Sequence, residues 1–131
     1  MVEEIDAYVK LHISHIDVNK VLKNGSQAKL VLGNVAIRKV RLYGRVLEIR
    51  RFRKFSDVLI DDGSGKITCR IWEGTRMPEL KEGDLVDVFG QIRLYNENLY
   101  VKTDIIRKIN EEFVKLREAE IKLTELILFK R

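Results

Sequence analysis

The chain has 131 residues, of which 45% are hydrophobic and 34% charged, and its formal net charge is +5. This length suits one domain with its own core, and the composition excludes a disordered chain. No run of about 18 apolar residues occurs and none follows the acidic start Met1-Val2-Glu3-Glu4, so we expect neither a transmembrane helix nor a signal peptide. The single cysteine, Cys69, cannot form an internal disulfide, which predicts a cytoplasmic protein.

Residues 1–34 mix polar and apolar positions, and we interpret them as an N-terminal arm that packs on the following domain. Alternation from Tyr8 to Ile13 predicts a short strand within this arm. His12 and His15 would then point to opposite faces of that strand, with no cysteine nearby. The sequence therefore predicts no metal site, and it predicts no other cofactor.

Residues 35–104 read as five strands. In the first strand, Val40, Leu42 and Val46 alternate with polar residues, and the apolar phase then moves to Leu47, which predicts a bulge that bends the strand. Further strands are predicted over 56–62, 65–72, 84–95 and 99–103, with Cys69 facing inward as an inert core thiol. Five strands with a bent first strand and a terminal helix predict an all-β OB-fold, a five-stranded Greek-key barrel between the arm and a C-terminal α-helix.

Residues 105–131 change to a helical period, with either Asp104 or Asn110 as the cap. This helix could fold back on the barrel or meet helices of partner subunits. Its apolar surface exceeds what one small barrel requires, which favours the second interpretation. The residues expected to mediate oligomerisation are Ile109, Phe113, Leu116, Leu123 and Ile127.

Basic residues are concentrated between Arg38 and Lys54, where eight of them accompany a single acid, Glu48. Such a run is often only a solvated strand face. Here Tyr43, Phe52 and Phe55 lie among the charges, which favours a polyanion as the partner.

Single-stranded nucleic acid is held by cations that follow the phosphates and by aromatic rings on which bases stack. Alternation places two arginine–aromatic pairs on the outward face, Arg70 with Trp72 and Arg93 with Tyr95. The loop after the first strand would border this groove from the other side with Arg50, Arg51, Phe52, Arg53 and Lys54.

The alternative roles are structural: Trp72 could close the core, and Tyr95 could stabilise its hairpin. For Phe89 and Tyr100, also outward, we expect packing under the arm or the terminal helix. No catalytic set of residues is visible, so the sequence does not predict an enzyme.

Three segments and the terminal amphipathic helix together resemble the OB domain of the middle and small subunits of replication protein A, over residues 12–129. The segments read LVLGNVAIRKVRLYGRVLEIRRF, DVLIDDGSGKITCRIWEG and LKEGDLVDVFGQIRLYNENLYV. The resemblance implies weak binding of single-stranded DNA and a C-terminal helix that joins a three-helix bundle in a heterotrimer. It also places the family's binding residues at Trp72, Arg93 and Tyr95.

No winged-helix domain or zinc-ribbon cysteines accompany the barrel, which points to a small subunit, and the charge-rich composition suggests an archaeal source. Subunits of a telomere-capping complex share this architecture. We therefore expect a subunit that binds and protects single-stranded DNA in replication, recombination and repair. The alternatives are a scaffold subunit with little DNA binding of its own, and an RNA-binding OB module.

Overall fold

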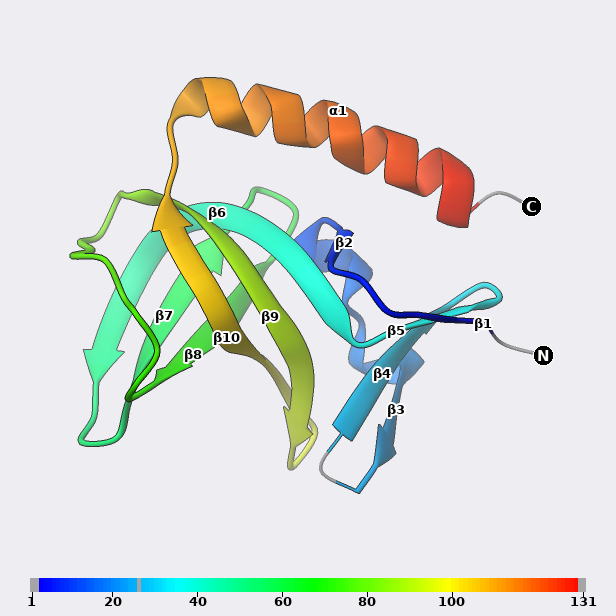
Figure 1. The fold of residues 1–131 in the computed structure, drawn as a ribbon, viewed down its shortest axis with the longest axis horizontal. Coiled ribbons are helices and arrows are strands. Elements are labelled where there is room, and N and C mark those ends of the chain that lie inside the picture. The colour runs from blue at the N-terminus through cyan, green and yellow to red at the C-terminus, as the bar shows by residue number, and fades with distance from the viewer. Residues whose placement is uncertain (1–2, 26, 130–131) are drawn as a thin grey trace.

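The computed structural model describes residues 3–25 and 27–129, which form two β-sheets and one long α-helix (Figure 1). The larger sheet has six strands in the order β2-β6-β7-β8-β10-β9, and a further pairing of β6 with β9 closes five of them into a barrel. The smaller sheet has four strands in the order β1-β5-β4-β3. In chain order the elements are β1 (Glu3–Ile5), β2 (Val9–Lys10), η1 (Ile13–His15), η2 (Val18–Lys20), β3 (Val21–Asn24), β4 (Gln27–Leu32), β5 (Val35–Ile37), β6 (Lys39–Arg51), β7 (Phe55–Asp61), β8 (Lys66–Trp72), β9 (Leu85–Tyr95), β10 (Asn98–Lys108) and α1 (Glu111–Leu128).

The barrel confirms the predicted all-β OB-fold with its Greek-key strand order. Burial alternates along β8, so that Ile67, Cys69 and Ile71 face the core. Burial raises the pKa of the Cys69 thiol to about 12, and the predicted inert core thiol is confirmed. The predicted bend lies in β6, where the register with β7 shifts between Val46 and Glu48.

Gly90 of β9 lies close against β10. A Cβ atom at this position would lie 2.3 Å from Cγ1 of Val101 and 2.6 Å from the backbone oxygen of Lys102. Because backbone cannot give way as a flexible side chain can, we expect Gly90→Ala to lower the free energy of unfolding by roughly 1–3 kcal/mol or more. Urea denaturation measures the loss. Gly65→Ala, whose Cβ would meet its nearest atom at 3.4 Å, is the control, and equal midpoints for the two variants would contradict the prediction.

The N-terminal segment is more ordered than an arm. Strand β2 pairs in parallel with β6, and Leu11, Ala28 and Leu30 belong to the same buried cluster as the barrel residues. The hairpin of β4 and β5 also crosses the boundary predicted between residues 34 and 35, because Gly33, with a φ of 59°, permits a tight turn there. The strand predicted from Tyr8 to Ile13 is shorter, since the 3₁₀ turn η1 begins at Ile13.

The helix begins later than residue 105. Strand β10 continues to Lys108, because Ile106 pairs with Val88 and is buried in the core. Of the two predicted caps, Asn110 is the one used: its side chain accepts a hydrogen bond of 3.0 Å from the backbone N–H of Phe113. Helix α1 then crosses over one end of the barrel and passes beside β2 (Figure 1).

Within residues 3–25 and 27–129, no helix combines the length and the apolar character that a membrane span requires.

Candidate nucleic-acid interface

Three aromatic rings cluster where the β6–β7 loop meets the end of β8. Phe55 pairs with Trp72 across β7 and β8, and their ring centroids are 5.0 Å apart. Phe52, in the loop, lies 4.9 Å from Phe55. Phe52 is 51% exposed and Trp72 is 38% exposed, so this aromatic cluster (Phe52, Phe55 and Trp72) presents ring faces to solvent. This exposure of Trp72 argues against the alternative role, in which its ring closes the core. A shallow cavity of about 180 Å³ adjoins these rings.

Arg70 lies at the centre of the outward face and is already paired. Its guanidinium donates to both carboxylate oxygens of Asp57, at 2.9 and 3.1 Å, and these hydrogen bonds raise the pKa of Arg70. Its Cζ atom lies 4.1 Å from the ring centroid of Phe55 and 4.8 Å from that of Tyr100. With its charge offset by Asp57, Arg70 is better suited to orienting rings than to holding a phosphate.

Tyr95 stands at the tip of the β9–β10 hairpin, 67% exposed. The turn is formed by Asn96 and Glu97, whose φ angles of 49° and 63° are typical of a tight hairpin. Arg93 lies two residues before Tyr95, and its guanidinium donates at 3.2 Å to the side-chain oxygen of Gln91. The structure thus keeps the predicted pair on the outward face.

The strand register separates the two arginine–aromatic pairs along the sheet. Tyr95 pairs with Asn98, and Tyr100 pairs with Thr68, four residues before Trp72 on β8. At about 3.3 Å per residue, the two exposed rings are therefore on the order of 20 Å apart along the strands. The β6–β7 loop lies beside Trp72, whereas the sequence argument placed this loop on the other side of the groove.

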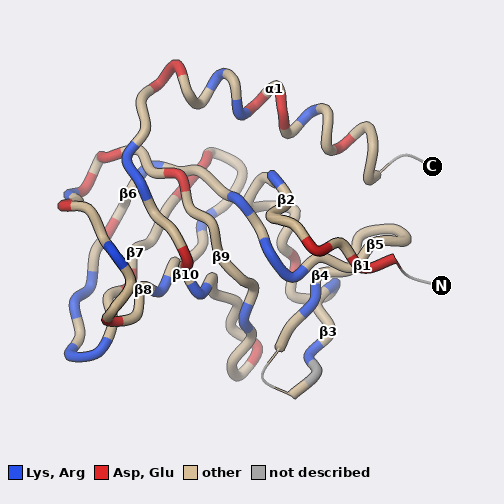
Figure 2. The backbone as a smooth tube through the Cα atoms, viewed as in Figure 1, with Lys and Arg blue, Asp and Glu red and all other residues tan. Residues whose placement is uncertain are grey.

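The predicted basic run divides into two parts with different surroundings. Its first half is neutralised, because Arg38 pairs with Glu4, Lys39 with Asp6, Arg41 with Asp87 and Arg45 with Glu111. Arg50 pairs with Glu48 at 2.6 Å. Within the part of the chain that the structure describes, Arg51, Arg53 and Lys54 have no ion-pair partner. Figure 2 shows these basic residues following one another around the turn from β6 to β7.

The remaining aromatic predictions concern Phe89 and Tyr100. Phe89 packs against the N-terminal segment, with its ring centroid 5.3 Å from that of Tyr8, as predicted. Tyr100 lies on the outward face, as predicted, and its ring is beside Arg70. The sequence reasoning also missed Asp57, although its pairing partner Arg70 lies directly across the ladder from it.

Helix α1 has one apolar side that is exposed to solvent. Most of its charged side chains lie on its other sides. Leu116, Leu123, Leu126 and Ile127 are each at least 59% exposed and, with the exposed Ala119, lie on one side of the helix; we call these five residues the outer face. Of the residues predicted to mediate oligomerisation, Leu116, Leu123 and Ile127 belong to it. Ile109 and Phe113 are half-buried and do not.

The inner side of α1 is attached to the barrel by a buried ion cluster that the sequence did not reveal. Asp87 on β9 is fully buried and accepts hydrogen bonds from Arg41 at 2.8 Å, Arg117 at 3.0 Å and Arg107 at 3.1 Å. Burial by itself raises the pKa of Asp87, but the hydrogen bonds from Arg41 and Arg117 outweigh it and hold the pKa below its usual value. Arg117 is 1% exposed, so the carboxylate of Asp87 takes the place of water beside its guanidinium.

The two histidines also attach α1, and they do not lie on opposite faces of a strand. Their rings stack at 5.4 Å, with His12 bonded to Glu118 at 2.9 Å and His15 to Glu125 at 3.0 Å. His12, His15 and Glu125 could present ligand atoms within 4.8 Å of one another. However, the Nδ1 atom of His15 already accepts the backbone N–H of His12, and its Nε2 atom faces Glu125, so both ring nitrogens are engaged. The geometry is that of helix anchors rather than of a metal centre.

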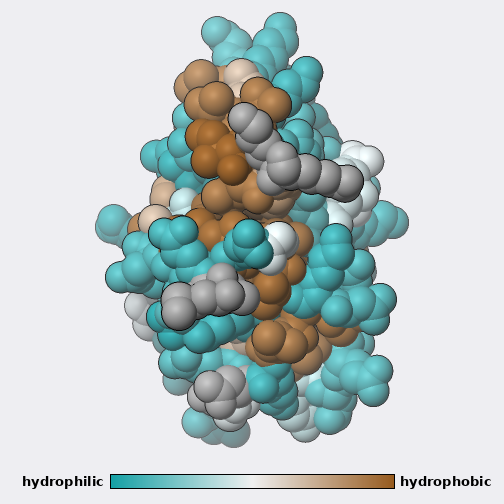
Figure 3. All heavy atoms as spheres, turned by 90° about the vertical axis from the view of Figure 1, so that its right-hand side faces the viewer, coloured by the Kyte–Doolittle hydropathy of each residue, from teal (hydrophilic) through white to brown (hydrophobic). Residues whose placement is uncertain are grey.

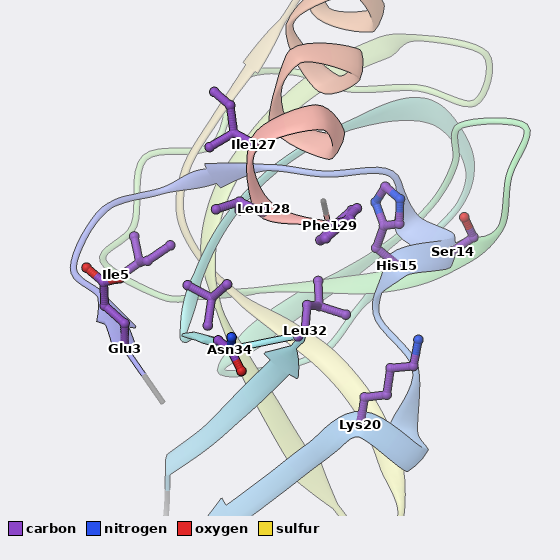
Figure 4. A pocket seen from close by; sticks show the side chains of 12 residues that line it. Glu3, Ile5, Ser14, His15, Lys20, Leu32, Asn34, Ile127, Leu128 and Phe129 are labelled. Carbon is purple, nitrogen blue, oxygen red and sulfur yellow. The ribbon is translucent and has the colours of Figure 1, made fainter. Parts of the chain in front are cut away.

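A groove of about 810 Å³ lies where the end of α1 meets the small sheet (Figure 4). Apolar side chains from both line it, among them Ile5, Leu32 and Val35 from the sheet side and Ile127 and Leu128 from the helix. Figure 3 shows hydrophobic residues running in a band down this side of the molecule. Since Ile127 belongs to both, the groove continues the outer face of α1.

Comparison with known families decides what this barrel is. The profile of the family described as OB-fold nucleic acid binding domain matches residues 40–127, about two thirds of the chain. The chain belongs to this OB-fold nucleic-acid-binding family. It is 34% identical over 113 residues to an uncharacterised protein of Methanocaldococcus jannaschii, an alignment covering 86% of this chain and 46% of that protein. The chain therefore spans less than half the length of that relative.

Two solved structures match this chain over nearly its whole length, from the N-terminal segment through the barrel to the terminal helix. A chain of a replication protein A heterotrimer bound to single-stranded DNA superposes with a TM-score of 0.82, at 17% identity, covering 95% of this chain and 100% of that one. A chain of the S. pombe Stn1–Ten1 complex superposes with a TM-score of 0.81, at 15% identity, covering 95% and 96%. The predicted resemblance to replication protein A subunits is confirmed for the fold, including the terminal helix.

Proposed function

We propose that this chain is a subunit of a replication protein A-like complex that binds and protects single-stranded DNA in replication, recombination and repair. The observation that carries the proposal is the exposed aromatic cluster on the outward face of the barrel, which adjoins Arg51, Arg53 and Lys54, three cations without an ion pair among the described residues. Stacking platforms beside cations are what single strands require.

The position of these residues within the fold supports the same proposal. OB-folds bind oligonucleotides on the face of their second and third strands and with two loops, one after the first strand and one between the fourth and fifth. Here those strands are β7 and β8, and the loops contain Phe52 and the Tyr95 hairpin. A strand of several nucleotides would run from the aromatic cluster to Tyr95, with Tyr100 and Arg70 beneath it.

The outer face of α1 supports the second half of the proposal, assembly with partner subunits. Leu116 and Leu123 are exposed seven residues apart, and Leu126 and Ile127 extend the same exposed side, which is typical of helices that pack with other helices. The barrel does not need this face, because α1 is held from its inner side by Arg117 and Ile121.

The test is a titration of the chain with oligo-dT, following the fluorescence of Trp72, the only tryptophan. We expect quenching that weakens steeply as salt rises. Tyr95→Ala should lower the affinity by about 5- to 150-fold, since a stacked base contributes roughly 1–3 kcal/mol. Leu22→Ala on β3, where the side chain is 64% exposed, is the matched control and should leave the affinity unchanged.

Two outcomes of this titration would overturn the DNA proposal. No quenching at high micromolar DNA would favour a scaffold subunit that works through α1 alone. Much tighter binding of oligo-U than of oligo-dT would favour an RNA-binding module, because the stacking platform accepts both and the 2′-hydroxyl would then be recognised.

A further inference from the structure

Helix α1 distributes its charges unevenly between its two sides. Four of its five acids are paired toward the barrel: Glu111 with Arg45, Glu118 with His12, Glu120 with Lys10 and Glu125 with His15. The fifth, Glu112, has no ion pair among the described residues. The acids of this helix are therefore largely unavailable to an outside partner.

Two lysines remain beside the outer face. Lys115 and Lys122 are exposed, seven residues apart, and border the same edge of the apolar stripe, next to Leu116 and Leu123. Neither has an ion-pair partner within the part of the chain that the structure describes. In helix packing, residues at these flanking positions set the choice of partner through interhelical charge pairs.

We propose that the occupant of the outer face is an amphipathic helix of a different chain, with acidic residues along the edge that faces Lys115 and Lys122. This inference rests on the docking role given to α1 in the proposed function and adds the chemistry of the partner. Apolar contact with Leu116, Leu123 and Ile127 provides the association, and the acidic edge provides the selection.

A second copy of this chain fits the surface poorly. Its own outer face would approach with the same two lysines at the edge. Its acids at 118, 120 and 125 are turned toward its own barrel, in pairs with His12, Lys10 and His15. Among the described residues, each copy would thus bring two lysines without an ion-pair partner to this face and only one such carboxylate, Glu112, which disfavours a homodimer through it.

The experiment uses the full chain and two synthetic helical peptides with leucine at both core positions of each heptad. One peptide carries glutamate at every flanking position and the other carries lysine, so that neither pairs with itself. Fluorescence anisotropy should show tighter binding of the acidic peptide, on the order of tenfold at low salt, with the preference shrinking as salt rises. The variant Lys115→Glu/Lys122→Glu should reverse the preference.

The controls separate this proposal from the proposed function. Lys66→Glu/Lys81→Glu makes the same charge change at exposed positions outside α1 and should keep the acidic preference. Equal binding of both peptides would leave docking intact and overturn the acidic partner. Binding of neither peptide would overturn the docking role itself, while oligo-dT binding is measured separately. Sedimentation of the chain alone as a dimer that Leu123→Ser dissociates would assign the face to a second copy.

Discussion

Asp87→Ala should destabilise the protein by about 3–5 kcal/mol, because it leaves the charge of Arg117 buried without its carboxylate. Asp87 is fully buried and Arg117 is 1% exposed, so water cannot replace the lost hydrogen bonds. The remaining acid near Arg117 is Glu120, whose oxygen lies 3.3 Å from the Nε atom. Thermal and urea denaturation measure the loss, which corresponds to a fall in Tm on the order of 10–20 °C.

The double variant Asp87→Leu/Arg117→Met is the decisive control. Replacing both charged residues with apolar ones leaves neither charge buried without its partner. This double variant should therefore recover much of the stability that Asp87→Ala loses. Arg107→Met removes a partner of Asp87 that is 51% exposed and should cost less than about 1 kcal/mol. A double variant as unstable as Asp87→Ala would mean that the loss comes from packing and not from an unpaired charge.

The effect of Asp87 should also depend on pH, with a definite sign. The pKa of Asp87 is lowered in the folded protein, so its contribution is fully present above the pKa of an aspartate in the unfolded chain. This contribution is lost as the pH falls through the folded value. The stability difference between the natural chain and Asp87→Asn should therefore narrow in acid.

The sequence predicted the barrel well because strand alternation reports directly which side chains face a core. Alternation placed Trp72 and Tyr95 outward, and both are exposed. The same reasoning failed at Asp87, which lies between the inward Val86 and Val88 and so reads as a solvent-facing residue. Nothing in the period of β9 reveals that a helix from the end of the chain covers it.

The small sheet and the helix were predicted less accurately for a related reason. Ala28, Leu30 and Leu32 alternate in β4, but a short strand beside an irregular segment has no periodic neighbour to distinguish it from an arm. Ile106 fits a helical stripe that continues to Phe113, although it lies in a strand. The helical stripe predicted an apolar surface on α1. Its outward orientation is set by ion pairs between residues up to 110 positions apart in the chain, which periodicity does not reveal.

The attachment of α1 also bears on how the two proposed functions are related. The helix is fastened at Asp87 on β9 and at β2, whereas the aromatic cluster lies at the β6–β7 loop and the end of β8. The surfaces proposed for partner docking and for DNA binding are thus separate. Changes in one surface should leave the other's affinity intact, which lets each be tested in variants of the same protein.

Phe52→Ala/Trp72→Ala should cause the largest loss of DNA affinity, about 30-fold at the least, because it removes two exposed stacking surfaces that contribute roughly 1–3 kcal/mol each. Since Trp72 is then absent as a reporter, anisotropy of a dye-labelled oligo-dT is the measurement. Phe55 stays in place under Arg70, and both replaced rings are at least 38% exposed, so the free energy of unfolding should change little.

The cations of the same region should respond differently from the rings, which distinguishes stacking from charge attraction. Arg53 has no ion pair in the described chain, so it is free to contact a phosphate. Arg53→Ala should therefore reduce the slope of log affinity against log salt concentration by about one. Arg70→Met/Asp57→Asn removes both charges of this pair together, so it should leave that slope nearly unchanged and weaken binding through the orientation of Phe55 and Tyr100. Two results would show that single-stranded DNA binds elsewhere on the barrel. One is an unchanged DNA affinity in Phe52→Ala/Trp72→Ala, and the other is an Arg70 variant that lowers the salt slope as much as Arg53→Ala does.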